Sequence, residues 1–375
     1  MRALIVAGGT GGHLSPGTAL ATEFFLAGEE VEFLSLEKNR NYPDLASAPF
    51  AVHYYNAPSL QRKPSALLFP FRLIKAMYVC SSLVRKAQAV VLMGGFPCLP
   101  AGLMARLYRR PVFLCEQNAV MGRANRFFAQ RATTVFLTFP LSGRNHPADW
   151  PVLGNPVRRK FLERTGHSAA LLGSGSASKR KAGDAAKDLA GKGSNPGKKG
   201  KRQTILVAGG SQGARQLNEM VLDLAKRFAE DFNKYDWVIQ VGLANEAAMK
   251  EAFAAYTNAT VIGFDPDIHR YYAEADLLLC RSGAGVLTEA FLFGLPCILV
   301  PYPFATDGHQ KENAMYAKIG GAAELIDTRQ SDAEPLHEIL ITLDKAKLDR
   351  MAEASKALAR PQAASAIMQR IRKEL

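Results

Sequence analysis

The stretches ALIVAGGTGGH, residues 3–13, and TILVAGGSQGA, residues 204–214, share one pattern: an apolar strand, paired glycines and a short polar loop. A helical pattern follows each loop, through Leu26 in the first case and from about Gln216 to Asp231 in the second. Glycines after a strand permit positive φ and close approach to a ligand, and the next helix offers its free N–H groups to an anion. The recurrence predicts two similar α/β domains, each a doubly wound, Rossmann-like sheet.

Short apolar runs alternate with helical patterns in the rest of both halves, as expected for βαβ units around parallel sheets. A chain of 375 residues also exceeds what one hydrophobic core usually serves. We place the domain boundary in GNPVR, so that residues 1–155 form the N-terminal domain and residues 156–359 the C-terminal domain. A C-terminal helix at about residues 360–375 is expected to pack back on the first domain. The other expected strands are residues 31–35, 89–93, 111–115, 237–241, 260–262, 277–280 and 297–300.

The net charge of +13 is concentrated in one segment, residues 166–202, which holds nine Lys or Arg residues and two Asp. This segment is rich in Gly, Ser, Ala and Lys and has no aromatic residue, so it cannot bury enough surface to offset its ordering entropy. We interpret it as a flexible, solvated insertion. A basic tether to anionic lipid headgroups or to nucleic acid is the alternative.

The five cysteines, an odd number without a C-x-x-C pair, argue against a disulfide framework or a zinc site and favour a reducing compartment. Cys115, Cys280 and Cys297 lie in apolar runs and are expected to be buried thiols. The first apolar run has only five residues, too short for a signal peptide, and no run approaches eighteen apolar residues. We therefore expect no membrane-spanning segment and no metal site.

Residues 67–87 mix apolar and basic side chains. A basic amphipathic helix of this kind can lie in a membrane interface, although a core-facing helix with snorkelling basic side chains has the same spacing. Spacing alone favours the core-facing interpretation. The candidate membrane-facing residues are Leu67, Leu68, Phe69, Phe71, Ile74 and Lys75.

The first glycine turn is not the dinucleotide fingerprint, because Leu14 stands where the third glycine of G-x-G-x-x-G would be. His13 stands at the mouth of this turn, where open α/β sheets bind ligands, but a histidine at a helix start is often an ordinary surface residue. In the second turn, the Ser211 hydroxyl and the loop amides suit a phosphate or pyrophosphate, and a tight turn that needs glycine is the alternative.

Residues 275–313 hold further candidates. Glu289 lies near the start of a helix, where a carboxylate can bind the hydroxyls of a ribose or merely stabilise the helix dipole. A polar cluster that includes His309 and Gln310 suits the hydroxyls of a sugar. Asp265-Pro-Asp267 has the spacing of a metal-binding D-x-D, but it precedes an amphipathic helix and is better interpreted as a helix N-cap.

Taken in order, these motifs resemble the MurG family of UDP-N-acetylglucosamine (UDP-GlcNAc) transferases of peptidoglycan synthesis. The resemblance covers most of the chain except residues 166–202. It is carried by GGTGGHLSPGTALA, MGGFPCLPAG, EQN, GNPVR, GGSQGARQLNE, CRSGAGVLTEA and HQKENA.

The resemblance implies a GT-B fold, with the active site in a cleft between two Rossmann-like domains. It implies UDP-GlcNAc as the donor and undecaprenyl-pyrophosphoryl-MurNAc-pentapeptide (lipid I) as the acceptor, which gives lipid II. The transfer would invert the anomeric centre and form a β-1,4 link without a metal or other cofactor.

The family's site residues carry over onto matching positions. His13 would be the base, with Glu116 a weaker candidate, and His309 with Gln310 would meet the sugar hydroxyls. Gly11, Gly12 and His13 would bind the acceptor pyrophosphate. The donor-binding set would be Thr10, Gly11, Gly12, Asn118, Arg158, Ser211, Gln212, Gly213, Asp265, Ala284, Gly285, Val286, Leu287, Thr288, Glu289, His309 and Gln310.

The family also implies a peripheral protein on the cytoplasmic face of the bacterial membrane, which favours the interfacial interpretation of residues 67–87 and contact with anionic lipids. The family implies that the protein works with the machinery for cell-wall synthesis or division and has roles in cell shape and division. It does not imply nucleic acid as a partner. Two departures stand out: the insertion at residues 166–202, and His309 where relatives often have Gln.

Four other functions remain open at this point. A GT-B enzyme for another lipid acceptor is disfavoured by the N-terminal turn together with EQN. A UDP-GlcNAc 2-epimerase would need no lipid acceptor and no apolar basic surface. An NAD(P) oxidoreductase lacks its fingerprint, although Glu37 stands where a ribose-binding acid would be, and a non-catalytic sugar-nucleotide-binding scaffold is the last alternative.

Overall fold

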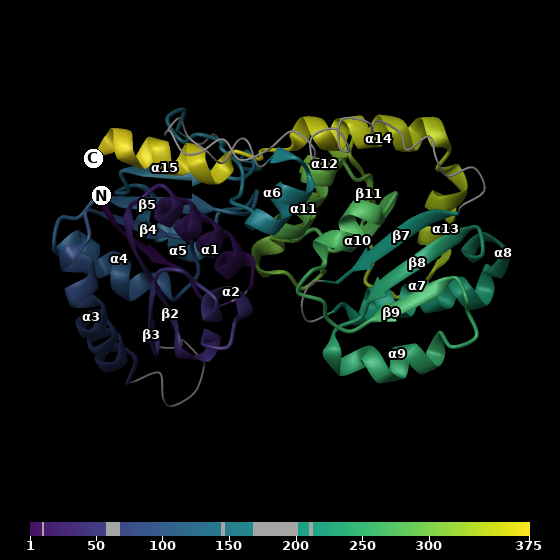
Figure 1. Cartoon of the computed structure of the whole chain (residues 1–375), viewed down its shortest axis with the longest axis horizontal. Helices are drawn as coiled ribbons and strands as arrows, with labels where there is room; N and C mark the ends of the chain where they lie inside the picture. Colours follow the sequence, from purple (N-terminus) through teal and green to yellow (C-terminus); the bar gives the residue numbers. More distant parts are fainter. Residues whose placement is uncertain (10, 58–67, 144–146, 168–201, 210–212) are drawn as a thin grey trace, which may run out of the picture. The chain divides into compact units, whose positions relative to one another are not determined.

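The computed structural model describes residues 1–9, 11–57, 68–143, 147–167, 202–209 and 213–375 (Figure 1). The chain forms two compact units. Unit 1 consists of Met1–Arg158 and Arg360–Leu375, and unit 2 of Arg159–Ala359. The divide falls at the end of GNPVR. Most of the basic insertion, residues 168–201, lies outside the described residues, as do residues 10, 67, 211 and 212.

Unit 1 is built on a parallel six-stranded sheet in the order β3-β2-β1-β4-β5-β6. Alternate residues of each strand enter different core clusters: Leu4 and Val6 face one side of the sheet, and Ala3 and Ile5 the other. The strands are β1 (Arg2–Val6), β2 (Glu30–Leu36), β3 (Ala51–Tyr55), β4 (Ala89–Leu92), β5 (Val112–Glu116) and β6 (Thr134–Leu137).

Helices cover both faces of this sheet. The helices α3, α4 and α5 bury side chains on one face, and α1 does so with the C-terminal helix α15 on the other. In α15, Ile367 and Ile371 join the core beside Phe24 of α1, and Arg372 Nε donates to Glu29 Oε1 at 2.7 Å. The helices are α1 (Gly11–Leu26), α2 (Pro43–Ala46), α3 (Phe69–Lys86), α4 (Cys98–Leu107), α5 (Arg123–Ala129) and α15 (Ala363–Glu374), with the 3₁₀ turn η1 (Glu37–Asn39).

Unit 2 repeats this topology with a second parallel sheet in the order β12-β11-β10-β7-β8-β9. Its core includes Trp237, which stacks on Phe232 with ring centroids 4.9 Å apart. The strands are β7 (Gln203–Ala208), β8 (Tyr235–Gln240), β9 (Ala259–Ile262), β10 (Leu277–Cys280), β11 (Cys297–Leu299) and β12 (Ala323–Leu325).

The helices of unit 2 lie before, between and after these strands. They are α6 (Arg159–Arg164), α7 (Arg215–Arg227), α8 (Ala229–Phe232), α9 (Glu246–Ala252), α10 (His269–Glu274), α11 (Ala284–Phe293), α12 (His309–Ile319), α13 (Glu334–Thr342) and α14 (Lys345–Leu358), with the 3₁₀ turns η4 (Leu243–Asn245) and η5 (Thr306–Gly308).

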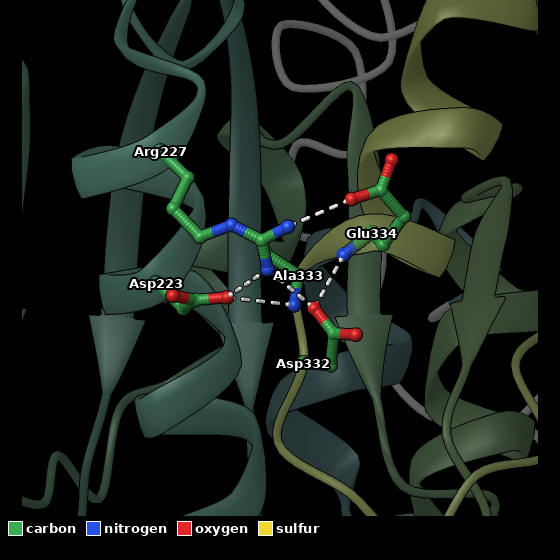
Figure 2. A network of polar contacts seen from close by, with 5 residues as sticks. All are labelled: Asp223, Arg227, Asp332, Ala333 and Glu334. Atoms are coloured by element: carbon green, nitrogen blue, oxygen red, sulfur yellow. Dashed lines mark hydrogen bonds and ion pairs between the residues drawn. The ribbon is translucent and has the colours of Figure 1, made fainter.

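A network of charges joins the end of α7 to the start of α13 (Figure 2). Arg227 donates to Asp223 and Asp332 through Nη1 and to Glu334 through Nη2, at 3.1, 2.6 and 2.8 Å. The Ala333 amide donates to Asp223 Oδ2 at 3.0 Å. The network therefore fixes where the chain enters α13, although its exposed charges are screened by solvent.

The strands expected from the sequence are confirmed, with small changes at their ends. The expected helix at 216–231 is confirmed to Arg227 and wrong only in its last turn, because α7 ends there and a separate short helix, α8, follows. The break lies at Phe228, whose φ of −126° and ψ of 49° are not helical. All five cysteines are buried free thiols, and burial raises the pKa of Cys80 and of Cys98 to about 12.

Candidate functional site

Both sheets change winding direction beside their first strand, between β1 and β4 in unit 1 and between β7 and β10 in unit 2. Open α/β sheets bind ligands at such a point, outside the carboxyl ends of the strands. The loops after β1, β4 and β5 in unit 1, and after β7, β10 and β11 in unit 2, carry most of the predicted site residues. Each unit therefore has its own candidate binding edge.

In unit 1 the first glycine turn leaves open space. Gly9 has a φ of +96°, and a β-carbon built on it would meet no atom within 4 Å. A β-carbon on Gly11, the first residue of α1, would meet only Tyr42 Oη at 3.8 Å. Gly12 is exposed, and Thr10 lies outside the described residues. Among the described residues, the space beside Gly9 and Gly11 is unfilled, whereas a β-carbon on Gly8 would lie 3.2 Å from Leu36 and Pro97.

His13 lies half-buried in the first turn of α1, and its ring lies beside the backbone after β4. Gly94 and Gly95 have φ of +98° and +77°. A β-carbon on Gly94 would lie 3.3 Å from His13 Nε2, and one on Gly95 would lie 3.3 Å from His13 Cε1. Glycine is therefore required at both positions, because the backbone has positive φ and because a side chain would crowd the His13 imidazole. Their pairing in MGGFP was visible in the sequence, but their contact with His13 was not.

Glu116 ends β5 and is buried. Its Oε1 accepts from Asn118 N at 3.0 Å, and its Oε2 accepts from Gly122 N at 2.9 Å and from Asn125 Nδ2 at 2.8 Å. Burial raises the pKa of Glu116, while these donors act in the opposite direction. Because both oxygens are engaged, the carboxylate holds the loop at 118–122 in place.

In unit 2 the glycines of the second turn are packed against backbone. Gly213 has a φ of +73°, and a β-carbon on it would lie 2.0 Å from Val241 O. A β-carbon on Gly209 would lie 2.2 Å from Ala214 N. The turn can be built only with glycine at these two places. Ser211 and Gln212, the predicted pyrophosphate contacts, lie outside the described residues.

The start of α11 is more open. Gly283 precedes the helix and Gly285 is its second residue, and β-carbons on both would meet no atom within 4 Å. Val286 and Glu289 are half-buried on this helix, whereas Leu287 and Thr288 are buried, as is Ala284. The Thr288 hydroxyl donates to Ala284 O at 2.7 Å. The side chains of Leu287 and Thr288 therefore belong to the fold, and the Leu287 amide donates to Gly283 O at 3.1 Å.

Arg281, which directly follows β10, connects the start of α7 with the residue that follows β11 through hydrogen bonds. Its Nη1 donates to Gln216 Oε1 at 2.9 Å and to Val300 O at 3.0 Å. Burial lowers the pKa of Arg281. Neither Arg281 nor Gln216 was predicted as a site residue, although a charged residue directly after the buried strand LLLC was a signal for Arg281.

Gln310, at the start of α12, is held from two sides. Its Oε1 accepts from Tyr302 N at 2.8 Å, and its carbonyl accepts from the Ser282 hydroxyl at 2.7 Å. His309 Nδ1 lies 2.7 Å from Thr306 O. Hydrogen bonds therefore hold the predicted sugar-binding residues against the segment that follows β11.

Asp265 and Asp267 do not cap α10 as expected, because that helix begins at His269 and its N-cap, Ile268, makes no side-chain capping bond. Asp265 Oδ1 accepts from Asp267 N at 2.7 Å and its Oδ2 from Arg270 at 2.9 Å. Lys160 donates to Asp267 at 2.7 Å and lowers the pKa of that carboxyl. Within the described residues, no group of three His, Cys, Asp or Glu could hold a metal ion.

The predicted membrane-facing helix is α3, which buries Ala76, Cys80 and Val84 on its other side. Its residues Phe71, Ile74 and Lys75 are exposed, and Leu68, which precedes it, is exposed too. Phe69 is half-buried against Phe96, with ring centroids 5.9 Å apart, so it belongs partly to the fold. Leu67 lies outside the described residues. None of the described helices is long and apolar enough to cross a membrane.

The remaining predicted residues are Asn118 and Arg158. Asn118 is held by Glu116 at the carboxyl end of β5, and Arg158 is half-buried at the last position of the first segment of unit 1.

Comparison with known proteins defines the class. Residues 3–137 match the glycosyltransferase family 28 N-terminal domain, and residues 204–371 match the glycosyltransferase family 28 C-terminal domain. The crystal structure of Acinetobacter baumannii MurG superposes with a TM-score of 0.72 at 26% identity and covers 100% of both chains. Two Rossmann-like units of this kind are the GT-B fold, so the predicted fold is confirmed: the chain is a GT-B glycosyltransferase.

The relatives define the family. A Leptospira interrogans protein (serogroup Icterohaemorrhagiae serovar copenhageni) is 34% identical over 349 residues, which is 90% of this chain and 88% of the relative. A Nitrosomonas europaea protein is 32% identical over 372 residues, covering 97% and 96%. Both are named UDP-N-acetylglucosamine–N-acetylmuramyl-(pentapeptide) pyrophosphoryl-undecaprenol N-acetylglucosamine transferase. The chain belongs to this family, the MurG family, as its motifs indicated.

The fold alone does not separate this family from others. A UDP-GlcNAc 2-epimerase from Neisseria meningitidis superposes with a TM-score of 0.65, covering 100% of both chains, at only 14% identity. That likeness concerns the architecture, and the relatives at 32–34% identity distinguish the families.

Proposed function

We propose that the chain transfers N-acetylglucosamine from UDP-GlcNAc to lipid I and so forms lipid II for peptidoglycan. The observation that carries this proposal is the 32% identity to the Nitrosomonas europaea transferase, which extends over 97% of this chain and therefore over both units. The proposal divides the ligands between the units: unit 2 takes the donor, and the first turn of unit 1 takes the acceptor pyrophosphate.

The proposed chemistry is a direct displacement with inversion. The acceptor hydroxyl oxygen attacks the anomeric carbon, the bond from that carbon to the UDP oxygen breaks, and His13 takes the hydroxyl proton. Two observations support this role: there is open space beside Gly9 and Gly11, and the His13 imidazole packs against Gly94. General-base catalysis by a positioned histidine typically contributes about 10²–10⁴-fold.

The departing UDP needs a positive environment. We propose that the free N–H groups at the starts of α7 and α11, with Arg158, supply it without a metal. Support comes from Asp265 and Asp267, the only D-x-D among the described residues, whose carboxylates are already engaged by Arg270 and Lys160.

We further propose that the protein lies peripherally on the cytoplasmic face of the membrane through α3, near the machinery for cell-wall synthesis or division. Support comes from the exposed Phe71 and Ile74 beside the exposed Lys75, because apolar side chains next to a basic one suit an anionic lipid surface. Replacing Phe71 and Ile74 with Ser should reduce binding to anionic liposomes, whereas the same change at Ile341, exposed on α13, should not. Unchanged binding would contradict the proposal.

The activity is tested by incubating the protein with labelled UDP-GlcNAc and a short-chain lipid I analogue, with and without EDTA. We expect transfer to the lipid that EDTA does not abolish. Failure to modify lipid I would refute the proposed acceptor, and transfer to diacylglycerol instead would identify another lipid glycosyltransferase. Strict dependence on a divalent metal would refute only the metal-free chemistry.

His13→Ala tests the base in the same assay. We expect kcat to fall by about 100-fold or more, because the acceptor hydroxyl loses its proton acceptor. His309→Ala is the matched control, since we place His309 at the donor and expect mainly a higher KM for UDP-GlcNAc. A near-normal kcat for His13→Ala would exclude His13 as the base.

A further inference from the structure

Two aromatic side chains lie exposed side by side after β11. Tyr302 is 46% exposed and Phe304 is 71% exposed, and their rings meet edge to face with centroids 5.7 Å apart. Arg281 lies against the Tyr302 ring, with the guanidinium carbon 5.5 Å from the centroid. The core of unit 2 uses neither ring, so the fold gives no reason for a pair of large apolar side chains here.

A fixed polar group lies beside these rings. Tyr302 N donates to Gln310 Oε1, and the Ser282 hydroxyl donates to Gln310 O. Because Oε1 is engaged, the Nε2 group is the part of this amide that can donate to a ligand. Flat apolar surface next to one oriented amide is a combination that suits a sugar, which has an apolar C–H face and a rim of hydroxyl groups.

The rings follow the strand next to the place where a diphosphate would bind. The winding direction changes between β7 and β10, where a diphosphate would meet the starts of α7 and α11. The strand β11 is the next neighbour of β10, and adjacent strands lie about 4.8 Å apart. A sugar attached directly to the diphosphate can therefore reach the loop after β11.

The opposite neighbour offers a different surface. The loop after β8 carries Leu243, an aliphatic side chain that is 69% exposed. The Asn245 side-chain amide in this loop already donates to Val241 O at 3.0 Å. Exposed aromatic rings beside an amide that can donate occur in the loop after β11 but not in the loop after β8. A sugar would therefore bind better on the β11 side of the diphosphate.

We propose that the hexosamine ring of the donor stacks on the face of Phe304, which meets Tyr302 edge to face, and that Gln310 Nε2 donates to one of the sugar's hydroxyl oxygens. The inference rests on the proposed function, because it takes a nucleotide sugar as the ligand of unit 2. Phe304 is the main contact since its ring is the more exposed. Arg281 is a positioning residue, which holds Tyr302 and through it the Gln310 amide.

The test is calorimetric titration of the full chain with UDP-GlcNAc and, separately, with UDP, which lacks the sugar. Phe304→Ala should weaken UDP-GlcNAc binding by about threefold to tenfold, the size expected for one aromatic contact, and change UDP binding by less than about twofold. Phe304→Trp should restore the binding of UDP-GlcNAc. Ile341→Ala, which removes an exposed apolar side chain elsewhere in unit 2, should change neither affinity.

Three results would overturn the inference while leaving the proposed function in place. Phe304→Ala could leave UDP-GlcNAc binding unchanged, weaken both ligands equally, or raise only the KM of the lipid acceptor. The first would mean that the ring touches no donor atom, the second that it acts on the nucleotide or the loop, and the third that it meets the acceptor. If the unmodified protein fails to bind UDP-GlcNAc, the proposed function itself is wrong and the inference falls with it.

Discussion

The two glycine turns have nearly the same sequence pattern, but the fold uses their glycines differently. In unit 2, β-carbons on Gly209 and Gly213 would lie 2.2 and 2.0 Å from backbone atoms, so the turn cannot be built otherwise. In unit 1, a β-carbon on Gly8, the counterpart of Gly209, would lie 3.2 Å from side-chain atoms of Leu36 and Pro97, whereas β-carbons on Gly9 and Gly11 would meet no described atom closer than 3.8 Å. The comparison teaches that glycine in such a turn can serve the fold in one place and a ligand in another.

The two units also differ in what lies behind the binding edge. In unit 1 a buried carboxylate, Glu116, holds the neighbouring loop through backbone and amide N–H groups. In unit 2 a half-buried cation, Arg281, does so through carbonyl and amide oxygens. The loops at the two binding edges are therefore held by groups of opposite charge.

The largest effect should come from Gly213→Ala. The substitution combines a φ of +73° with a contact of 2.0 Å to Val241 O, and we expect a loss of about 3 kcal/mol or more in the free energy of unfolding. Urea unfolding measures it. Gly285→Ala, an open position on α11, is the control and should cost less than about 0.5 kcal/mol. Equal stability of the two variants would remove the distinction drawn for unit 2.

Glu116→Gln should destabilise the chain by about 1–3 kcal/mol, because an amide NH₂ group would then face N–H donors that now meet an oxygen. Urea unfolding together with kinetics separates the two roles of this residue. A holding role predicts lower stability and a smaller loss of kcat than His13→Ala. Full stability with a kcat as low as that of His13→Ala would instead make Glu116 the base.

Gly11→Ala should leave stability unchanged or slightly higher, since the position has open space and lies in a helix. We expect activity with the lipid I analogue to fall by about tenfold, as for the loss of a close contact between backbone and ligand. The expected change is in the KM of the acceptor, with UDP-GlcNAc affected less. A fully active variant would show that the open space at Gly11 is not used by substrate.

The smallest effect should come from Arg227→Ala, which removes the centre of the network between α7 and α13 (Figure 2). These charges are exposed, so we expect only a small decrease in the urea midpoint, and a smaller one at high salt. Arg372→Ala, which breaks the contact of α15 with Glu29 in unit 1, is the counterpart. If Arg227→Ala lowered the free energy of unfolding as much as Gly213→Ala, these charges would be essential for the packing of α7.

The sequence predicted the strands that are buried on both faces and are followed by glycine or a polar loop. It did not reveal β3, whose AVHYY lies at the sheet edge with mixed exposure, or β12, which has only three residues. It also did not reveal β6, because TVFL is followed by no glycine turn. Short edge strands form because they pair with neighbouring strands, and the periodicity of apolar residues in the sequence does not show this pairing.

For the site, the sequence identified His13 and the loops around it but not what fixes their positions. The seat of His13 on Gly94 and Gly95, and the link from Arg281 to Gln216, each join segments that are far apart in the chain. These contacts follow from strand order, which brings the carboxyl ends of distant strands to one edge. The pattern of glycines likewise could not show which of them lack a neighbour, because that depends on the packed fold.

The return of the chain to unit 1 has a consequence for synthesis. Unit 2 is one continuous segment, whereas unit 1 needs Arg360–Leu375 in addition to its first 158 residues. Until α15 is made, Phe24 and the rest of the inner face of α1 lack their cover from Ile367 and Ile371. A ribosome therefore completes unit 2 before unit 1, and the nascent N-terminal half carries an uncovered apolar face of the kind that chaperones protect.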